Sequence, residues 1–147
     1  MQKIIPPVLF LICIVLMLVL WWFYPVYQWL SFPLSLIGAA PFIVGIGIAI
    51  HGSQVFEKKE TNIETFDDPN VLVTDGIFKF SRNPMYVGFV TALFGIAIIL
   101  GDASTIVIAI SFLVITDRWY IPFEEKAMER VFGEAYLEYK TKVRRWI

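Results

Sequence analysis

The chain has 147 residues, of which 58% are hydrophobic and only 17% are charged. Soluble domains usually contain about 45–50% apolar and about 25% charged residues, so this composition argues against a soluble globular protein. The single cysteine excludes an intrachain disulfide. The formal net charge of −1 says little about partners, because the charges are very unevenly placed along the chain; we expect no nucleic-acid partner.

Four apolar runs dominate the chain, and each is interpreted as a membrane-spanning helix. The runs cover residues 4–24, 32–50, 84–100 and 103–119. A spanning helix needs about 20 apolar residues, which the first two runs supply easily, whereas the last two runs are short. Residues 101–104 have turn chemistry, so the last two runs are predicted to form a tight helical hairpin.

The basic residues all lie on one predicted side of the membrane. Segments 1–3, 51–83 and 117–147 contain all 12 lysines and arginines, and the opposite loops at 25–31 and 101–104 contain none. The positive-inside rule therefore places both ends of the chain in the cytoplasm. The small size is compatible with a prokaryotic plasma membrane, which we expect as its location.

The predicted fold class is an all-α integral membrane protein with four transmembrane helices in one domain, residues 1–147. A cytoplasmic loop is expected at 51–83, and cytoplasmic helices at 122–145. Small residues recur every three or four positions along two of the runs, which indicates close helix packing but also leaves room for a ligand. These residues are Gly38, Pro41, Gly45 and Ala49, then Gly88, Ala92 and Gly95. One histidine, one cysteine and no carboxylate cluster inside the spans argue against a metal site.

The stretch before the third run carries polar groups at the predicted cytoplasmic surface. Residues 71–78 are interpreted as a short extended hairpin around an Asp-Gly turn. Pro84 suits the first turn of a helix, because its missing N–H would be unbonded there anyway. Ser81, Asn83 or both can cap that helix end.

Arg82 is expected at the cytoplasmic mouth of the third span, beside a positive helix terminus. Free N–H groups, the helix dipole and a guanidinium together attract an anion at such a place. The alternative is that Arg82 is one more positively charged membrane anchor.

A second polar stretch follows the fourth run. Pro122 disfavours helix at Ile121 and favours a new helix start. Glu124 and Glu125 then fall in the first turn, where the helix dipole stabilises carboxylates. Apolar residues recur every four positions over 123–143, interrupted only by a glycine, and form an amphipathic face. Such a helix can lie on the membrane surface, although that interpretation does not explain the glutamate pair.

Two signatures, in the right order, make residues 71–147 similar to a known family. The stretch Arg82-Asn83-Pro84-Met85-Tyr86-Val87-Gly88 resembles the Arg-His-Pro-x-Tyr-x-Gly signature of isoprenylcysteine carboxyl methyltransferases and phospholipid N-methyltransferases. The family's C-terminal signature is similar to Pro122-Phe123-Glu124-Glu125, then Phe132-Gly133-x-x-Tyr136-x-x-Tyr139-x-x-x-Val143-Arg144-Arg145. The remaining residues match the family only as generic membrane helices.

The resemblance implies an integral membrane enzyme that takes a methyl group from S-adenosylmethionine (SAM). It implies that the following residues form the SAM site: Arg82, Asn83, Pro84, Tyr86, Gly88, Glu124, Glu125 and Tyr136. Of these, we assign catalytic roles to Arg82, Asn83, Tyr86 and Glu124.

The chemistry of these side chains agrees with the parts of SAM. Arg82 can pair bidentately with the carboxylate of SAM. Glu124 or Glu125 can accept from its ammonium group or its ribose hydroxyls. Tyr86 or Tyr136 can present an aromatic face or a hydroxyl to the adenine or the sulfonium.

Asn83 departs from the signature, which has histidine at this position. Asparagine donates and accepts hydrogen bonds but does not take a proton near pH 7. If the histidine serves in hydrogen bonding, Asn83 preserves its role; if it transfers a proton, another base such as Glu124 or Tyr86 is needed. A carboxylate acceptor needs only positioning and desolvation, whereas a thiol or amine must lose a proton. The change therefore favours an acid or an already ionised thiol over an amine.

We therefore expect a membrane methyltransferase that acts on an apolar or lipid-like acceptor, a carboxylate or thiol such as an isoprenylcysteine-type substrate. SAM would enter from the cytoplasm, and the acceptor would approach laterally from the lipid bilayer. A channel or transporter is disfavoured, because the spans carry no charged residue between their ends. A non-catalytic membrane scaffold, or a degenerate relative that has lost SAM, is the remaining alternative. The sequence leaves the oligomeric state open.

Overall fold

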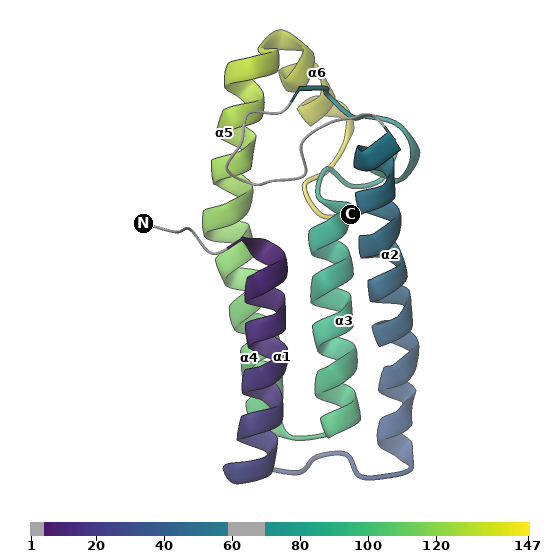
Figure 1. Cartoon of the computed structure of the whole chain (residues 1–147), viewed down its shortest axis with the longest axis vertical. Helices are drawn as coiled ribbons and strands as arrows, with labels where there is room; N and C mark the ends of the chain where they lie inside the picture. The colour runs from purple at the N-terminus through teal and green to yellow at the C-terminus, as the bar shows by residue number, and fades with distance from the viewer. Residues whose placement is uncertain (1–4, 59–69) are drawn as a thin grey trace.

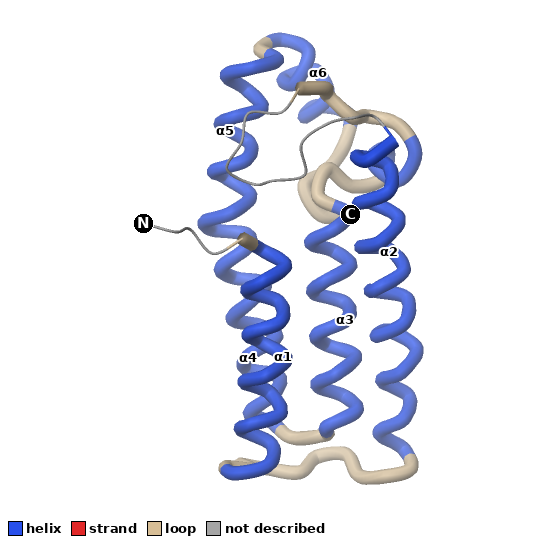
Figure 2. Tube along the Cα trace, viewed as in Figure 1, coloured by secondary structure: helices blue, strands red, loops and turns tan. Residues whose placement is uncertain are grey.

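The computed structural model describes residues 5–58 and 70–147, and these residues contain helices but no strand (Figure 2). The helices are α1 (Pro6–Phe23), α2 (Ala39–Lys58), α3 (Pro84–Leu100), α4 (Ala103–Ile115), α5 (Ile121–Phe132) and α6 (Glu134–Lys142). Figure 1 shows α1 to α4 side by side along the long axis, with α5 extending beyond the bundle and α6 folding back. The predicted all-α fold class is confirmed for this part of the chain.

Three continuous helical segments are long and apolar enough to cross a membrane: Pro6–Phe23, Leu34–Lys58 and Ala103–Phe132. The second includes a 3-10 turn that precedes α2. α3 is a shorter apolar helix of 17 residues and has the bounds of the predicted third run. The count of four spans therefore stays a prediction. α2 continues past the predicted end at residue 50 and ends at Lys58, so the first residues of the predicted loop are helical. Residues 59–69 of that loop lie outside the described residues.

α3 and α4 form the predicted tight helical hairpin. Gly101 ends α3 in the left-handed region, with a φ of 64°, and donates its N–H to the carbonyl of Ala97. Asp102 is the N-cap of α4 and accepts from the N–H of Ser104 at 3.0 Å. A β-carbon on Gly101 would collide with the carbonyl oxygen of Leu30, so the turn requires glycine for both its φ and this close approach.

The small-residue stripes bring the backbones of α2 and α3 together, as the sequence predicts. A β-carbon at Gly45 would lie 2.5 Å from the carbonyl oxygen of Gly88 and from the nitrogen of Ala92. One at Gly88 would lie 2.6 Å from the carbonyl oxygen of Gly45. Neither position accepts a side chain unless the helices move apart, so these glycines serve helix packing.

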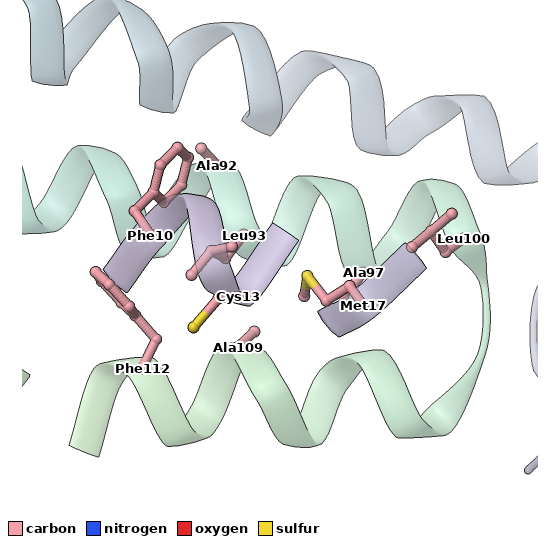
Figure 3. Packing of buried hydrophobic residues seen from close by; sticks show 9 residues of the cluster. All are labelled: Phe10, Cys13, Met17, Ala92, Leu93, Ala97, Leu100, Ala109 and Phe112. Carbon is pink, nitrogen blue, oxygen red and sulfur yellow. The ribbon is translucent and has the colours of Figure 1, made fainter. Parts of the chain in front are cut away.

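A buried apolar cluster joins α1 to the α3–α4 hairpin (Figure 3). α1 contributes Phe10, Cys13 and Met17; in Figure 3 the side chains of Cys13 and Met17 lie between α3 and α4, and Phe10 lies against α3. The hairpin contributes Ala92, Leu93, Ala97, Leu100, Ala109 and Phe112. This packing holds the first turn of α1 near the first turn of α3, where a cavity opens.

The predicted extended hairpin at residues 71–78 is wrong. The chain forms a 3-10 turn there, Gly76–Lys79, in which Phe78 N–H bonds to the carbonyl of Asp75 at 3.1 Å. Gly76 has a φ of 60°, but no second strand follows it because the Phe78 side chain turns inward and is buried. Its ring packs edge-on against Phe56 of α2.

Pro122 does not start a separate helix, which corrects the second local prediction. α4 continues into α5 through a π-helical turn, Thr116–Tyr120, and the N–H of Ile121 bonds to the carbonyl of Thr116. This wider turn accommodates the proline near the start of α5, where an N–H is not needed. The predicted amphipathic face also does not continue through residues 123–143, because Gly133, with a φ of 51°, separates α5 from α6.

Candidate active site at the mouth of α3

The first turn of α3 begins as the sequence predicts but is capped differently. Pro84 is in the first turn and Asn83 occupies the N-cap position, yet the Asn83 side chain makes no cap hydrogen bond. Its Nδ2 instead donates to the carbonyl of Arg145 at 2.9 Å, which draws the amide away from the helix end. Ser81 Oγ accepts from the backbone N–H of Asn83 at 3.1 Å, so a serine holds the local turn.

Arg82 points into the protein, which does not fit the membrane-anchor alternative. Its side chain is only 9% exposed and its Nη2 lies 3.0 Å from Oε1 of Glu125. Within the described part of the chain, the buried Nε and Nη1 of Arg82 have no hydrogen-bond partner. Buried donors are usually satisfied. The Nε and Nη1 of Arg82 are therefore available to donate to a ligand in the cavity that Arg82 lines.

Glu125 receives a second arginine from the segment after α6. Arg145 Nη2 lies 2.8 Å from Glu125 Oε2, and Arg145 Nε donates to Glu125 Oε1 at 3.3 Å. Asp117, in the π turn, accepts from Arg145 Nη1 at 3.4 Å and from Trp146 Nε1 at 2.9 Å. The hydrogen bond to Glu125 raises the pKa of Arg145 above its ordinary value, although burial acts in the opposite direction.

Glu124 accepts a hydrogen bond from a tyrosine. The hydroxyl of Tyr86, on α3, donates to Glu124 Oε1 at 2.8 Å. Tyr86 is buried in the first turn of α3, and both Tyr86 and Arg82 line the same cavity. The two neighbouring glutamates of α5 therefore have different partners and different surroundings.

Two further tyrosines, from α6, close the site. Tyr136 lines the cavity, and burial raises its pKa above the ordinary value. Tyr139 donates its hydroxyl to the carbonyl of Phe78 at 2.6 Å, and burial raises the pKa of Tyr139 to about 12. Both phenols are therefore neutral at physiological pH, and Tyr139 fixes the 3-10 turn against α6.

The cavity has a volume of about 340 Å³, within the range of about 300–1,000 Å³ that is usual for ligand pockets. Seven of the eight residues predicted for the SAM site line it: Arg82, Asn83, Pro84, Tyr86, Glu124, Glu125 and Tyr136. Gly88 is not among the lining residues and lies at the contact between α2 and α3. The rest of the wall is mostly apolar and comes largely from α1, α2 and α3, including Pro6, Ile46, Ile50, Phe56 and Phe89, with further residues from the segment before α3 and from α5 and α6.

The sequence reasoning missed two parts of this site. Asp117 was given no role, and Arg145 was quoted only as part of a signature, although both belong to one hydrogen-bonded network with Glu125. A signal existed, because Asp117 is one of the first charged residues after a long apolar run and such residues usually have a partner. The apolar wall carried no signal, because its residues look like any other lipid-facing or core positions.

The chain is similar to known membrane methyltransferases. A family model described as phospholipid methyltransferase matches residues 34–135. Protein-S-isoprenylcysteine O-methyltransferase B of Arabidopsis thaliana is 32% identical over 80 residues, which are 52% of this chain and 39% of that protein. The protein-S-isoprenylcysteine O-methyltransferase of Saccharomyces cerevisiae is 37% identical over 79 residues, 52% of this chain and 32% of its own length.

A solved structure has the same fold. The eukaryotic intramembrane Ras methyltransferase, isoprenylcysteine carboxyl methyltransferase, superposes with a TM-score of 0.68 and 25% identity, covering 96% of this chain and 51% of that chain. The chain thus spans about half, or less, of the length of these relatives. Its long apolar helices and its likeness to an intramembrane protein identify it as an integral membrane protein. Because the family model matches more than half of its residues, the chain belongs to the phospholipid methyltransferase family.

Proposed function

We propose that this chain is a membrane-embedded methyltransferase that moves a methyl group from SAM to an apolar or lipid-like acceptor. The observation that carries the proposal is the guanidinium of Arg82, which is buried beside a cavity of about 340 Å³ and whose Nε and Nη1 have no hydrogen-bond partner among the described residues. Leaving buried donors unsatisfied costs about 1–3 kcal/mol each. A bound anion would remove part of that cost, and a carboxylate such as that of SAM is a strong acceptor for a guanidinium N–H.

The other polar groups of the cavity suit the remaining parts of SAM. Glu124, oriented by Tyr86, offers an anionic acceptor for the ammonium or the ribose hydroxyls. The face of Tyr136 suits the adenine or the sulfonium cation. When bound there, SAM would supply an electrophilic methyl group. The protein supplies position and a site from which water is largely excluded.

The apolar wall supports a lipid-like acceptor that approaches from the bilayer. The first turn of α1 and the middle of α2 form this wall, and both belong to segments long enough to span a membrane. In the arrangement that we propose, four helices cross the membrane and both ends of the chain are cytoplasmic. The cavity then opens toward the cytoplasm of a prokaryotic cell, where SAM is made.

The contact of Asn83 supports an acceptor that needs no base. The Asn83 amide donates to the main chain of Arg145, which is a structural hydrogen bond, and asparagine does not take a proton near pH 7. A carboxylate or a thiolate already has the lone pair that forms the bond to the methyl carbon. The carbon–sulfur bond breaks in the same step and its electrons return to sulfur, so no proton has to move. We therefore propose as the acceptor an acid, such as the free carboxylate of an isoprenylcysteine, or an ionised thiol.

Transfer of a labelled methyl group tests the proposal. Purified protein in phospholipid vesicles is incubated with SAM carrying a tritiated methyl group, and with a prenylated cysteine that has either a free carboxylate or an amide in its place. We expect label in the organic phase for the carboxylate only. Label that follows the phospholipid alone would contradict the proposed acceptor. No label in any acceptor, from protein that is folded and binds SAM poorly, would favour the non-catalytic alternative.

A further inference from the structure

The segment after α6 is tied to the mouth of α3 by its main chain. The backbone N–H of Arg82 donates to the carbonyl of Arg144 at 3.0 Å. Asn83 Nδ2 and Ser81 Oγ donate to the carbonyl of Arg145, at 2.9 and 3.4 Å. Figure 1 shows the end of the chain beside the start of α3. Three consecutive residues, Ser81 to Asn83, therefore hold the main chain at Arg144 and Arg145.

The side chain of Arg145 reaches across to α5 and the π turn. It contacts both oxygens of Glu125, and on its other edge it contacts Asp117. A chain of alternating charges thus runs from Asp117 through Arg145 and Glu125 to Arg82. This chain of charges ends at the guanidinium of Arg82, whose Nε and Nη1 have no hydrogen-bond partner among the described residues.

The contacts of Glu125 decide how much of Arg82 is free for a ligand. Arg145 binds both carboxylate oxygens of Glu125, so Arg82 contacts that carboxylate through Nη2 alone. Carboxylates prefer to pair with an arginine bidentately. Without Arg145, the Glu125 carboxylate could turn to take two N–H groups of Arg82, and this intramolecular pairing would compete with an incoming anion.

We propose that Arg145 is a positioning residue of the cofactor site: by holding Glu125, it keeps Nε and Nη1 of Arg82 free, so that the carboxylate of SAM can accept from one of these two nitrogens. The inference rests on the proposed function. It also gives Asn83 a specific task, because the Asn83 amide holds the main chain of Arg145 in place. Histidine is not required for that task, since an asparagine side chain donates the same hydrogen bond.

Binding of two nucleosides tests the inference. S-adenosylhomocysteine has the amino-acid carboxylate of SAM, and 5′-methylthioadenosine lacks the whole amino-acid group. We expect Arg145→Ala to weaken S-adenosylhomocysteine binding at least tenfold and to leave methylthioadenosine binding within twofold of the parent. Arg145→Lys keeps the charge but not the bidentate geometry, so it should restore part of the loss. Lys142→Ala, which removes an exposed positive charge on α6, should change neither affinity.

The outcomes separate a failure of the inference from a failure of the proposed function. Equal losses for both ligands would mean that Arg145 only stabilises the fold, and no loss for either would mean that it does not act on the site; both results overturn the inference alone. A folded parent that binds neither nucleoside would overturn the proposed function and, with it, the inference. If Arg145→Ala does not fold, Arg145→Lys carries the test, because a selective loss for S-adenosylhomocysteine is expected there too.

Discussion

Arg82 and Glu125 form an ion pair at 3.0 Å in which the two side chains are only 9% and 10% exposed. The two residues lie 43 positions apart in the sequence, Arg82 just before α3 and Glu125 on α5, so the pair fixes the projecting α5 to the mouth of α3. Removing charged groups from water is costly, and a buried pair is tolerated when additional hydrogen bonds satisfy its members. Arg145 supplies such bonds to Glu125, whereas Arg82 keeps two donors for a ligand.

Glu125→Ala should destabilise the protein strongly, because it leaves the buried guanidinium of Arg82 without its partner. Breaking a buried pair by removing one member typically costs about 3–5 kcal/mol. Thermal unfolding of the detergent-solubilised protein measures the effect. Lys142→Ala, which breaks an exposed pair with Glu138, is the control and should leave the melting temperature nearly unchanged. Similar losses in both variants would contradict the structural role given to Glu125.

Two glycines of α2 should respond in opposite ways to the same substitution. Gly45→Ala places a methyl group 2.5 Å from backbone atoms of α3, so we expect a lower melting temperature and weaker SAM binding. Gly47→Ala meets no atom within 4 Å and should be neutral or stabilising by up to about 1 kcal/mol, because alanine is the better helix former. If Gly45→Ala proves harmless, α2 and α3 are not in backbone contact.

Asp102 should stabilise the end of the bundle opposite the cavity. Its buried carboxylate accepts from the N–H groups of Val26 and Tyr27 at 3.1 and 3.0 Å, and it also caps α4. Asp102→Ala leaves these N–H groups without their acceptor, so we expect a loss of at least about 1 kcal/mol, the usual cost of a lost cap. Methyl transfer at the far end should be retained once the protein is folded.

The contribution of Asp102 should also depend on pH. Burial acts to raise the pKa of this carboxyl, but the hydrogen bonds from Ser104, Val26 and Tyr27 together hold it below the ordinary value of 3.8. A group with a depressed folded-state pKa stabilises the protein above its unfolded pKa and loses that effect as the pH falls through the folded value. The melting temperatures of the parent and Asp102→Ala should therefore differ at pH 7 and converge below pH 3.8. If the difference in melting temperature between the two proteins does not change with pH, the charge of the Asp102 carboxylate does not account for its contacts with the N–H groups of Val26 and Tyr27.

The sequence predicted what local patterns and composition determine. The apolar runs predicted the helices. Gly101 indicated the hairpin turn, because a residue with a left-handed backbone conformation and no room for a side chain has to be glycine. Pro122 misled, because a proline marks a new helix start only when the residues before it are not helical, and here a π-helical turn runs directly into α5. A π turn before it is decided by tertiary contacts, among them those of Asp117, which no local pattern encodes.

The candidate site was predicted as a set of residues but not as a geometry. The resemblance of two signatures brought Arg82 and the glutamates together, and the structure places them around one cavity. Which glutamate pairs with Arg82 and which with Tyr86 could not be read, because the two are adjacent and the choice depends on the rotation of α5. The partner of Asn83 is a backbone carbonyl, and every residue has one, so no sequence signal identifies it.

Calorimetric titration of S-adenosylhomocysteine into the detergent-purified parent and into Arg82→Ala tests the central claim most directly. Arg82→Lys is a second variant that keeps the charge, and Lys142→Ala is the control. We predict micromolar binding to the parent and the control, and at least tenfold weaker binding to Arg82→Ala, about 1.4 kcal/mol. Arg82→Lys should restore only part of the lost affinity, since one ammonium group cannot replace the planar guanidinium of arginine. Unchanged affinity in a folded Arg82→Ala, or no binding by a folded parent, would contradict the assignment of this cavity as the SAM site.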